Sequence, residues 1–379
     1  MHEQGLSRKE PLLRVVKRQE LAPRQASLLK FVSLILALIA GGLFLALLGY
    51  NPFVIYATII SGAFRSELAI QGTVKLMIPL FISALGVTLA YKMQFWNIGA
   101  EGQIIIGAIC ASYFALFCNG LPRPVLLIIM LIASMIGGGI WGIIPAIFKN
   151  RWNTNETLFT LMLNYIALHI ISFLRDGPWR DPANPGFAKI ATFTENATLP
   201  KLFGVHIGWV IALILFVLVY IYLTYTKHGY EIAVIGGSKA TANYAGMNVK
   251  KIVLRTVFLS GAICGIAGFS NAAGSDLTLA AGVAGGVGFT AIIVAWLADL
   301  NPVGILIVSF LFAVLGKGSS VIQSSYGLST DCSDVLEGII LFFVIAGGFF
   351  VRYRFVLRKN HTDGVDGSKK TEVKGGEGA

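Results

Sequence analysis

Residues 124–148 read PVLLIIMLIASMIGGGIWGIIPAIF, a run of 25 residues without a charged side chain. As a helix this run would rise about 38 Å. The hydrocarbon core of a bilayer is only about 30 Å thick. The segment therefore predicts a transmembrane helix and sets the class of the whole fold.

The rest of the 379-residue chain has the same character. Hydrophobic residues make up 55% of it, charged residues only 13%, and the mean hydropathy is +0.74. Soluble domains carry roughly 25% charged residues, so the composition argues against a water-soluble enzyme. The short alternating strands that are typical of membrane barrels are missing. We therefore predict an all-α fold, a polytopic bundle of transmembrane helices.

Apolar runs of suitable length predict about ten spans. They cover residues 28–49, 69–91, 103–118, 124–148, 156–175, 206–226, 252–273, 283–299, 301–317 and 334–352. The third, eighth and ninth are short or interrupted by glycine. With both termini in the cytoplasm, 22 of the 30 Lys and Arg residues lie on the inside, as the positive-inside rule requires.

We expect the chain to divide into a basic cytoplasmic tail (1–27), a transmembrane domain (28–355) and a disordered cytoplasmic tail (356–379). Residues 176–205 form the longest outer loop. Residues 227–250, KHGYEIAVIGGSKATANYAGMNVK, form the longest inner loop and are rich in small side chains. The net charge of +11 suits loops that face anionic membrane lipid. The basic residues are not gathered into one patch, so we expect no nucleic-acid partner.

Polar side chains collect where the third span begins, in Asn97-Ile98-Gly99-Ala100-Glu101-Gly102-Gln103. Asn97 and Glu101 are four residues apart and share a helix face. A carboxylate near the membrane must find water or a partner. The run is either a polar element that lines a pathway or pins a broken helix, or an interfacial helix start with Glu101 in water.

A second polar stripe, Glu156, Thr160 and Asn164, repeats every four residues on the fifth span. Such a stripe faces a cavity or the bundle interior, or else serves hydrogen bonding between helices. On the seventh span, Gly261, Gly265 and Gly268 have the spacing that allows close helix packing.

Catalytic and metal-binding motifs do not occur in the sequence. It contains no G-x-x-x-x-G-K-[ST] for nucleotide binding, and no H-E-x-x-H or G-x-S-x-G for hydrolysis. The five histidines are scattered and the four cysteines lack zinc-type spacing. We therefore expect no catalytic residues, no metal site and no ATP hydrolysis in this chain.

Several stretches, in the right order, resemble the permease subunits of ABC importers for nucleosides and simple sugars, a family that includes ribose and branched-chain amino acid permeases. They are FWNIGAEGQ (95–103), NETL (155–158), LMLNYIA (161–167), LTLAAGVAGGVGFTAIIVAWLADLNP (277–302) and the inner loop 227–250. The resemblance covers about residues 30–350. The chain departs from the family pattern at Glu231, Gly237-Ser238, Trp296 and Ala298-Asp299, which puts the match to a particular ATPase in doubt but not the family.

The resemblance implies a multi-pass protein of the bacterial cytoplasmic membrane that works by alternating access. Its partners would be a second permease subunit in a heterodimer, a cytoplasmic ABC ATPase and an extracytoplasmic substrate-binding lipoprotein. ATP and Mg²⁺ would be bound by the ATPase, so this chain needs no cofactor and is not itself an enzyme. Nucleosides such as guanosine or uridine are the expected substrates, with ribose-like sugars as the alternative.

The resemblance also suggests roles for particular residues. The inner loop would couple to the ATPase, since small side chains suit a helix seated in a groove; the alternative is a solvated loop. The coupling residues are Gly229, Tyr230, Ala233, Gly236, Ala242, Ala245 and Gly246. The pathway residues are Asn97, Glu101, Gln103, Glu156, Thr160 and Asn164. A competing hypothesis is a secondary transporter whose ion site would be the carboxylate pair Glu101 and Glu156.

Overall fold

The computed structural model describes residues 13–18, 23–118, 120–184, 186, 188–328 and 330–357. The chain divides into two compact units. The first contains residues 1–35 and 343–379, and the second contains residues 36–342.

The first unit contains a small antiparallel ladder between β1 (Leu13–Lys17) and β4 (Tyr353–Leu357). Leu13 lies opposite Leu357, and Lys17 lies opposite Tyr353. The sequence pattern did not predict these strands, and β4 crosses the predicted boundary between 355 and 356. Most of the predicted tails, residues 1–12, 19–22 and 358–379, lies outside the described residues.

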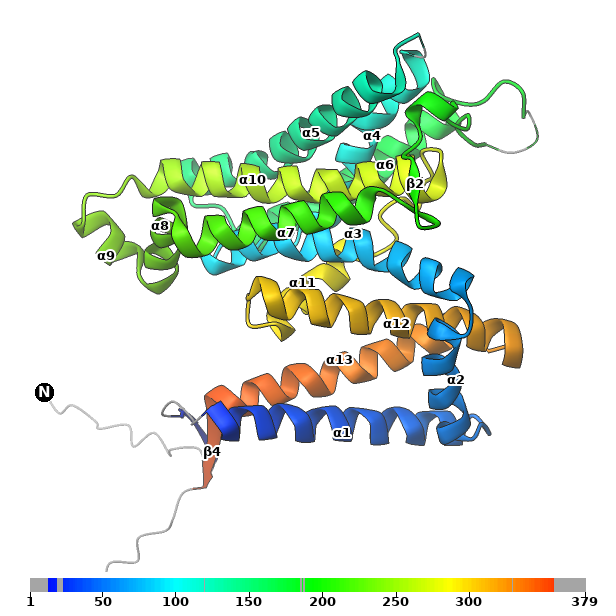
Figure 1. The fold of residues 1–379 in the computed structure, drawn as a ribbon. Coiled ribbons are helices and arrows are strands. Elements are labelled where there is room, and N and C mark those ends of the chain that lie inside the picture. Colours follow the sequence, from blue (N-terminus) through cyan, green and yellow to red (C-terminus); the bar gives the residue numbers. More distant parts are fainter. Residues whose placement is uncertain are drawn as a thin grey trace, which may run out of the picture. The chain divides into compact units, whose positions relative to one another are not determined.

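Helices make up nearly all of the remaining described chain (Figure 1). They are α1 (Pro23–Leu47), α2 (Pro52–Phe64), α3 (Glu67–Lys92), α4 (Ala100–Phe117), α5 (Arg123–Trp152), α6 (Glu156–Asp176), α7 (Gly208–Tyr225), α8 (Lys227–Gly237), α9 (Lys239–Tyr244), α10 (Val249–Ser270), α11 (Val287–Leu297), α12 (Pro302–Tyr326) and α13 (Thr330–Arg352). Short elements between them are the 3-10 turn η1 (Glu195–Ala197), the strands β2 (Lys201–Leu202) and β3 (Val205–His206), and the π-helical turn η2 (Asn271–Asp276).

Seven helices among the described residues are long and apolar enough to cross a membrane. The number rises to eight if residues Phe31–Leu47 of α1 and the helix α2, which meet at 113°, form one broken span. The helix α2 was not predicted from the sequence. In place of the predicted span 283–299, α11 has 11 residues and rises only about 16 Å, because Gly285 and Gly286 adopt φ of +54° and +81° just before it. The count of ten spans stays a prediction.

Polar side chains fix where many of these helices begin. In each case a side-chain oxygen accepts a hydrogen bond from a backbone N–H of the first turn, which satisfies one of the free donors there. The capping residues are Asn51 for α2, Ser66 for α3, Asn155 for α6, Thr226 for α8, Ser238 for α9, Asn248 for α10 and Asn301 for α12.

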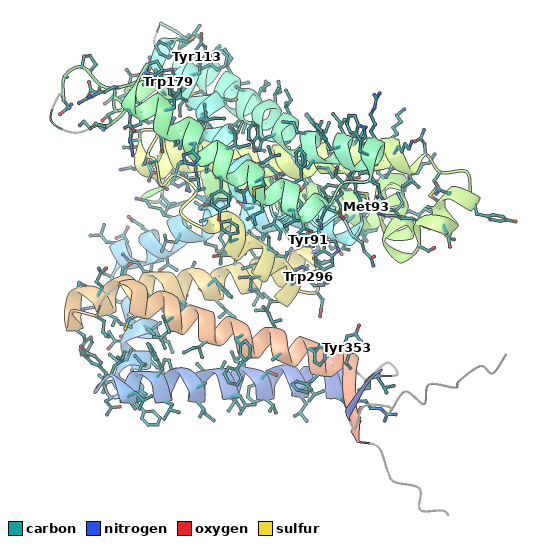
Figure 2. The ribbon with its side chains drawn as sticks, turned by 180° about the vertical axis from the view of Figure 1, so that it is seen from behind. Tyr91, Met93, Tyr113, Trp179, Trp296 and Tyr353 are labelled. Atoms are coloured by element: carbon teal, nitrogen blue, oxygen red, sulfur yellow. The ribbon has the colours of Figure 1, made fainter. Side chains whose placement is uncertain are left out.

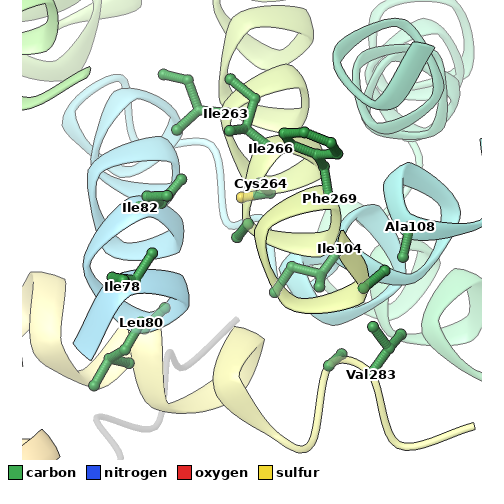
Figure 3. Packing of buried hydrophobic residues seen from close by; sticks show 14 of the residues in the cluster. Ile78, Leu80, Ile82, Ile104, Ala108, Ile263, Cys264, Ile266, Phe269 and Val283 are labelled. Atoms are coloured by element: carbon green, nitrogen blue, oxygen red, sulfur yellow. The ribbon is translucent and has the colours of Figure 1, made fainter. Parts of the chain in front are cut away.

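Helix α10 lies at the centre of the second unit, packed against α3, α4 and α5. Its buried side chains interleave with those of α3 and α4 in the core (Figure 3). The predicted packing glycines lie at these contacts. A Cβ atom would overlap the carbonyl oxygen of Gly138 if added at Gly261, that of Ser134 if added at Gly265, and that of Ile104 if added at Gly268. Their role in close helix packing is confirmed.

Candidate functional site

The turn that leads into α4 is closed by two facing side-chain amides. Asn97 Nδ2 donates to Gln103 Oε1 at 3.4 Å, and Gln103 Nε2 donates to Asn97 Oδ1 at 3.3 Å. Asn97 Oδ1 also accepts the Gly99 N–H at 3.0 Å. Both amides are buried, so each satisfies polar atoms that would otherwise be costly to bury.

Helix α6 holds the same turn from the other side. Asn164 Oδ1 accepts the Gly102 N–H at 2.9 Å, while Asn164 Nδ2 donates to the Ile98 carbonyl oxygen at 2.9 Å. One helical turn earlier, Thr160 Oγ1 accepts the Ile98 N–H at 3.2 Å. Two of the three residues of the polar stripe on α6, Thr160 and Asn164, thus bond to the backbone of the turn.

Glu101 fastens α4 to α11. Its Oε1 accepts the Gly286 N–H and its Oε2 accepts the Gly288 N–H, both at 2.8 Å. Its side chain is buried, with only 4% of the residue exposed. A carboxylate at a helix N-terminus compensates free N–H groups and the positive end of the helix dipole. Of the two interpretations of this residue, pinning a broken helix describes its contacts in this conformation, and Glu101 is not in water.

Glu156 lies apart from this network. Its Oε2 pairs with Lys149 Nζ of α5 at 2.8 Å. Glu101 and Glu156 are therefore bound to separate partners and do not form a shared carboxylate site. No group of three His, Cys, Asp or Glu side chains that could hold a metal ion occurs within the described ranges.

The far end of α11 is held by aromatic rings. Trp296 stacks on Trp96 with ring centroids 5.6 Å apart, and Tyr91 meets both rings edge-on. Figure 2 shows Tyr91 and Trp296 side by side near the end of α3. The short helix α11 is thus tied to the turn before α4 at one end and to Glu101 at the other.

A cavity of about 450 Å³ opens beside the segment that Glu101 holds. Its wall is formed by α3, η2, the loop 282–287 and α12. The polar residues that line it are Lys75, Asn271, Ser275, Asp276, Lys317 and Ser320. Ligand pockets typically have volumes of about 300–1,000 Å³ and a few convergent polar groups, so this cavity has the size and lining of a site for a small solute.

Behind the cavity lies His206, which is almost fully buried in β3. Its Nε2 is 3.3 Å from Ser275 Oγ, and its ring packs against Gly208 and Gly274. Burial, together with the nearby Lys75 charge, lowers the pKa of His206 to about 4. The imidazole is therefore neutral at physiological pH.

The sequence interpretation missed the ionisable groups of this cavity. Neither Lys75 nor Lys317 was predicted as a site residue, nor was Asp276. The available signal was a lysine inside a long apolar run, since a charge there is costly unless it serves a function. The structure brings together Asn97, Glu101, Gln103, Thr160 and Asn164, and Glu101 links this group to the segment beside the cavity.

The inner loop 227–250 folds as two short helices, α8 and α9. Gly236 and Ala242, predicted to face a partner, instead pack inward: a Cβ atom at Gly236 would overlap the Lys92 carbonyl oxygen, and Ala242 is fully buried. The outward face presents Tyr230, 64% exposed, and Tyr244, 96% exposed. Also exposed are Ala233, Ala245 and Gly246, whereas Gly229 is buried.

An ion pair links α8 to α10. Arg255 donates to Glu231 Oε2 at 2.9 Å, and His228 Nδ1 lies 3.3 Å from the same oxygen. The hydrogen bond from Arg255 lowers the pKa of Glu231 below its usual range. Because α10 continues into η2, which lines the cavity, this pair joins the inner loop to the helix that carries Asp276.

The family described as "Branched-chain amino acid transport system / permease component" matches residues 68–345. The glucose ABC transporter permease protein TsgB13 of Haloferax volcanii is 31% identical over 336 residues, covering 85% of this chain and 88% of the relative.

Two further relatives come from one organism, Bacillus subtilis. The guanosine ABC transporter permease protein NupP is 29% identical, over 86% of this chain and 94% of the relative. The guanosine ABC transporter permease protein NupQ is 26% identical, over 71% of this chain and 86% of the relative.

Proposed function

The chain belongs to the branched-chain amino acid transport system / permease component family, and from this membership we propose that it is the pore-forming subunit of an ATP-driven importer of nucleosides. It is a multi-pass protein of the bacterial inner membrane. The cavity between α3, η2 and α12 is the observation that supports the transport role best. It provides a polar space among helices that are otherwise apolar.

In this proposal, the cavity is part of the substrate pathway and the Glu101 network holds its wall. Glu101 fixes Gly286 at the end of the lining loop 282–287. Asn97, Gln103, Thr160 and Asn164 fix the turn that carries Glu101. In this proposal, these residues position the wall of the pathway. Glu156 contributes to the pathway through its ion pair with Lys149.

The substrate assignment follows the relatives. Two permeases named for guanosine match most of this chain, which favours nucleosides. A permease named for glucose matches it as well, so a simple sugar is the second candidate. An ion-coupled mechanism has less support, because Glu101 and Glu156 do not meet.

The same relatives support a set of partners. The occurrence of two guanosine permeases in Bacillus subtilis favours a heterodimer of this chain with a second permease. A cytoplasmic ABC ATPase that binds ATP and Mg²⁺ would contact the outward face of α8 and α9, and a lipoprotein would deliver the solute from outside. We also propose about ten spans with both termini in the cytoplasm, which the distribution of Lys and Arg favours.

Uptake of radiolabelled guanosine, uridine, ribose and glucose tests the function. Cells that lack the gene are compared with cells complemented by it, with equal membrane abundance checked by immunoblot. We expect nucleoside uptake to vanish on deletion and return on complementation. If deletion abolishes sugar uptake instead, the substrate assignment changes from nucleosides to sugars. If deletion changes the uptake of none of the four solutes, the proposal is refuted.

A further inference from the structure

We propose that Asp276, together with Lys75 and Lys317, forms the solute-binding part of the cavity and takes the vicinal hydroxyl groups of a neutral, sugar-containing solute. This inference rests on the proposed transport function. It assigns contact residues and a recognition chemistry to the cavity.

The position of the two lysines is the first argument. Lys75 lies eight residues inside α3, and Lys317 lies nine residues before the end of α12. At 1.5 Å per residue these positions are about 12 Å and about 14 Å from the nearer helix ends, well within membrane-length helices. Charged side chains at such positions are costly and mark substrate pathways. Both line the same cavity as Asp276.

The side chains of these three residues are not paired within the protein. Among the residues that the structure describes, the side chains of Asp276, Lys75 and Lys317 make no hydrogen bond and no ion pair. Two other carboxylates of the second unit, Glu101 and Glu156, do find partners. One carboxylate and two ammonium groups are therefore available to a solute.

The chemistry of the three groups matches a diol. A carboxylate accepts hydrogen bonds from two adjacent hydroxyl groups, and an ammonium donates to hydroxyl oxygens. Asn271 adds a further acceptor, since its Nδ2 donates to the Val283 carbonyl oxygen at 2.8 Å while its Oδ1 faces no described donor. Hydrogen bonds to charged groups are stronger than those between neutral groups. A neutral polyhydroxy solute can therefore form several of these stronger hydrogen bonds in the cavity.

The lining also indicates what is not recognised. Among the described residues that line the cavity, none is aromatic. Aromatic side chains are the usual stacking surface for a nucleobase. The cavity therefore recognises the sugar of the solute rather than the base. Hydroxyl groups are the chemical feature that nucleosides and hexoses share.

The test compares solutes that differ only in hydroxyl groups. Uptake of uridine, 2′-deoxyuridine and 2′,3′-dideoxyuridine is measured with the complete importer, for the wild type, Asp276→Asn and Lys317→Met. Glu195→Gln and Lys201→Gln serve as controls, because both residues are exposed and lie outside the cavity. The same binding protein delivers each solute to every variant, so its selectivity cancels in the ratio of variant to wild type.

For Asp276→Asn we expect the half-saturating concentration of uridine to rise about tenfold or more, since hydrogen bonds to a charged group are lost. The value for 2′,3′-dideoxyuridine should change less than about twofold, as should both control variants with uridine. An equal loss for all three solutes would show a structural role and overturn the inference. Unchanged uridine uptake in Asp276→Asn would overturn it too. If the wild type takes up neither nucleosides nor sugars, the proposed function itself fails.

Discussion

The Gly288 N–H donates to Glu101 Oε2 at 2.8 Å, and this bond joins the first turn of α11 to the first turn of α4. The two residues are 187 positions apart in the chain. A Cβ atom at Gly288 would overlap the backbone nitrogen of Glu101. The contact thus needs both a carboxylate on one helix and a glycine on the other.

Replacing Glu101 by Gln should weaken this junction. The amide keeps one acceptor oxygen but presents an NH₂ group to the second backbone N–H, which leaves a buried donor unsatisfied at a cost of about 1–3 kcal/mol. We expect a lower melting temperature of the purified protein and at least a tenfold fall in uptake. The exposed Glu195→Gln is the control, and a variant that melts and transports like the wild type would contradict the assigned role.

Replacing Gly288 by Ala tests the same junction from α11. The added methyl group overlaps the Glu101 backbone, and overpacking of this kind costs about 1–3 kcal/mol or more. Folded protein in the membrane should decrease strongly. Gly282→Ala is the matched control, because a Cβ atom there meets nothing within 4 Å; equal abundance of the two variants would exclude the close approach.

The outward face of α8 and α9 should behave differently from its inward face. Tyr244→Ala removes a ring of a residue that is 96% exposed, so membrane abundance should stay within about twofold. ATP-driven uptake should fall about tenfold or more, since exposed aromatic side chains often dominate binding at interfaces. Co-purification of the ATPase measures the contact directly.

Gly236→Ala provides the contrast, because its methyl group would overlap the Lys92 carbonyl oxygen inside the chain. Here we expect lower abundance of folded protein rather than a specific loss of coupling. If Tyr244→Ala leaves ATPase binding and uptake intact, this face is solvated and the coupling assignment is wrong.

His206 should make stability depend on pH. Its pKa is about 4 in the folded protein against an ordinary value of 6.5, so the unfolded chain binds the extra proton first as pH falls. The neutral ring contributes its full stability above about pH 6.5, and roughly 3 kcal/mol is lost as pH falls towards 4. Melting temperatures between pH 4 and 8 check this. His206→Gln should reduce the dependence of the melting temperature on pH in that window. An unchanged pH dependence in this variant would show that other groups cause it.

Much of the fold could be predicted because membrane helices have a strong sequence signature. The runs at 69–91, 124–148 and 156–175 correspond to α3, α5 and α6 within a few residues. The helix α2 was missed because its 13 residues are too few for a span. The span predicted at 283–299 was longer than α11 because the glycines before α11 do not interrupt the apolar character of the sequence.

The site was predicted only in part, for a physical reason. The residue pattern singled out Glu101 and Asn164 as polar residues of interest but left open whether Glu101 lies in water. The hydrogen bond from Gly286 to Glu101 spans 185 residues of sequence and depends on tertiary packing. The inward orientation of Gly236 is likewise a property of how α8 packs on α3. The cavity charges belong to helices far apart in sequence, so only the fold brings them together.

The central claim is ATP-driven import of a nucleoside through this chain, and reconstitution tests it most directly. Proteoliposomes would contain this chain, its partner permease and the ATPase, with the binding protein outside and ATP inside. We predict accumulation of radiolabelled guanosine that requires ATP hydrolysis and persists when ionophores abolish ion gradients. Accumulation that ignores ATP and disappears with the ionophores would contradict the account.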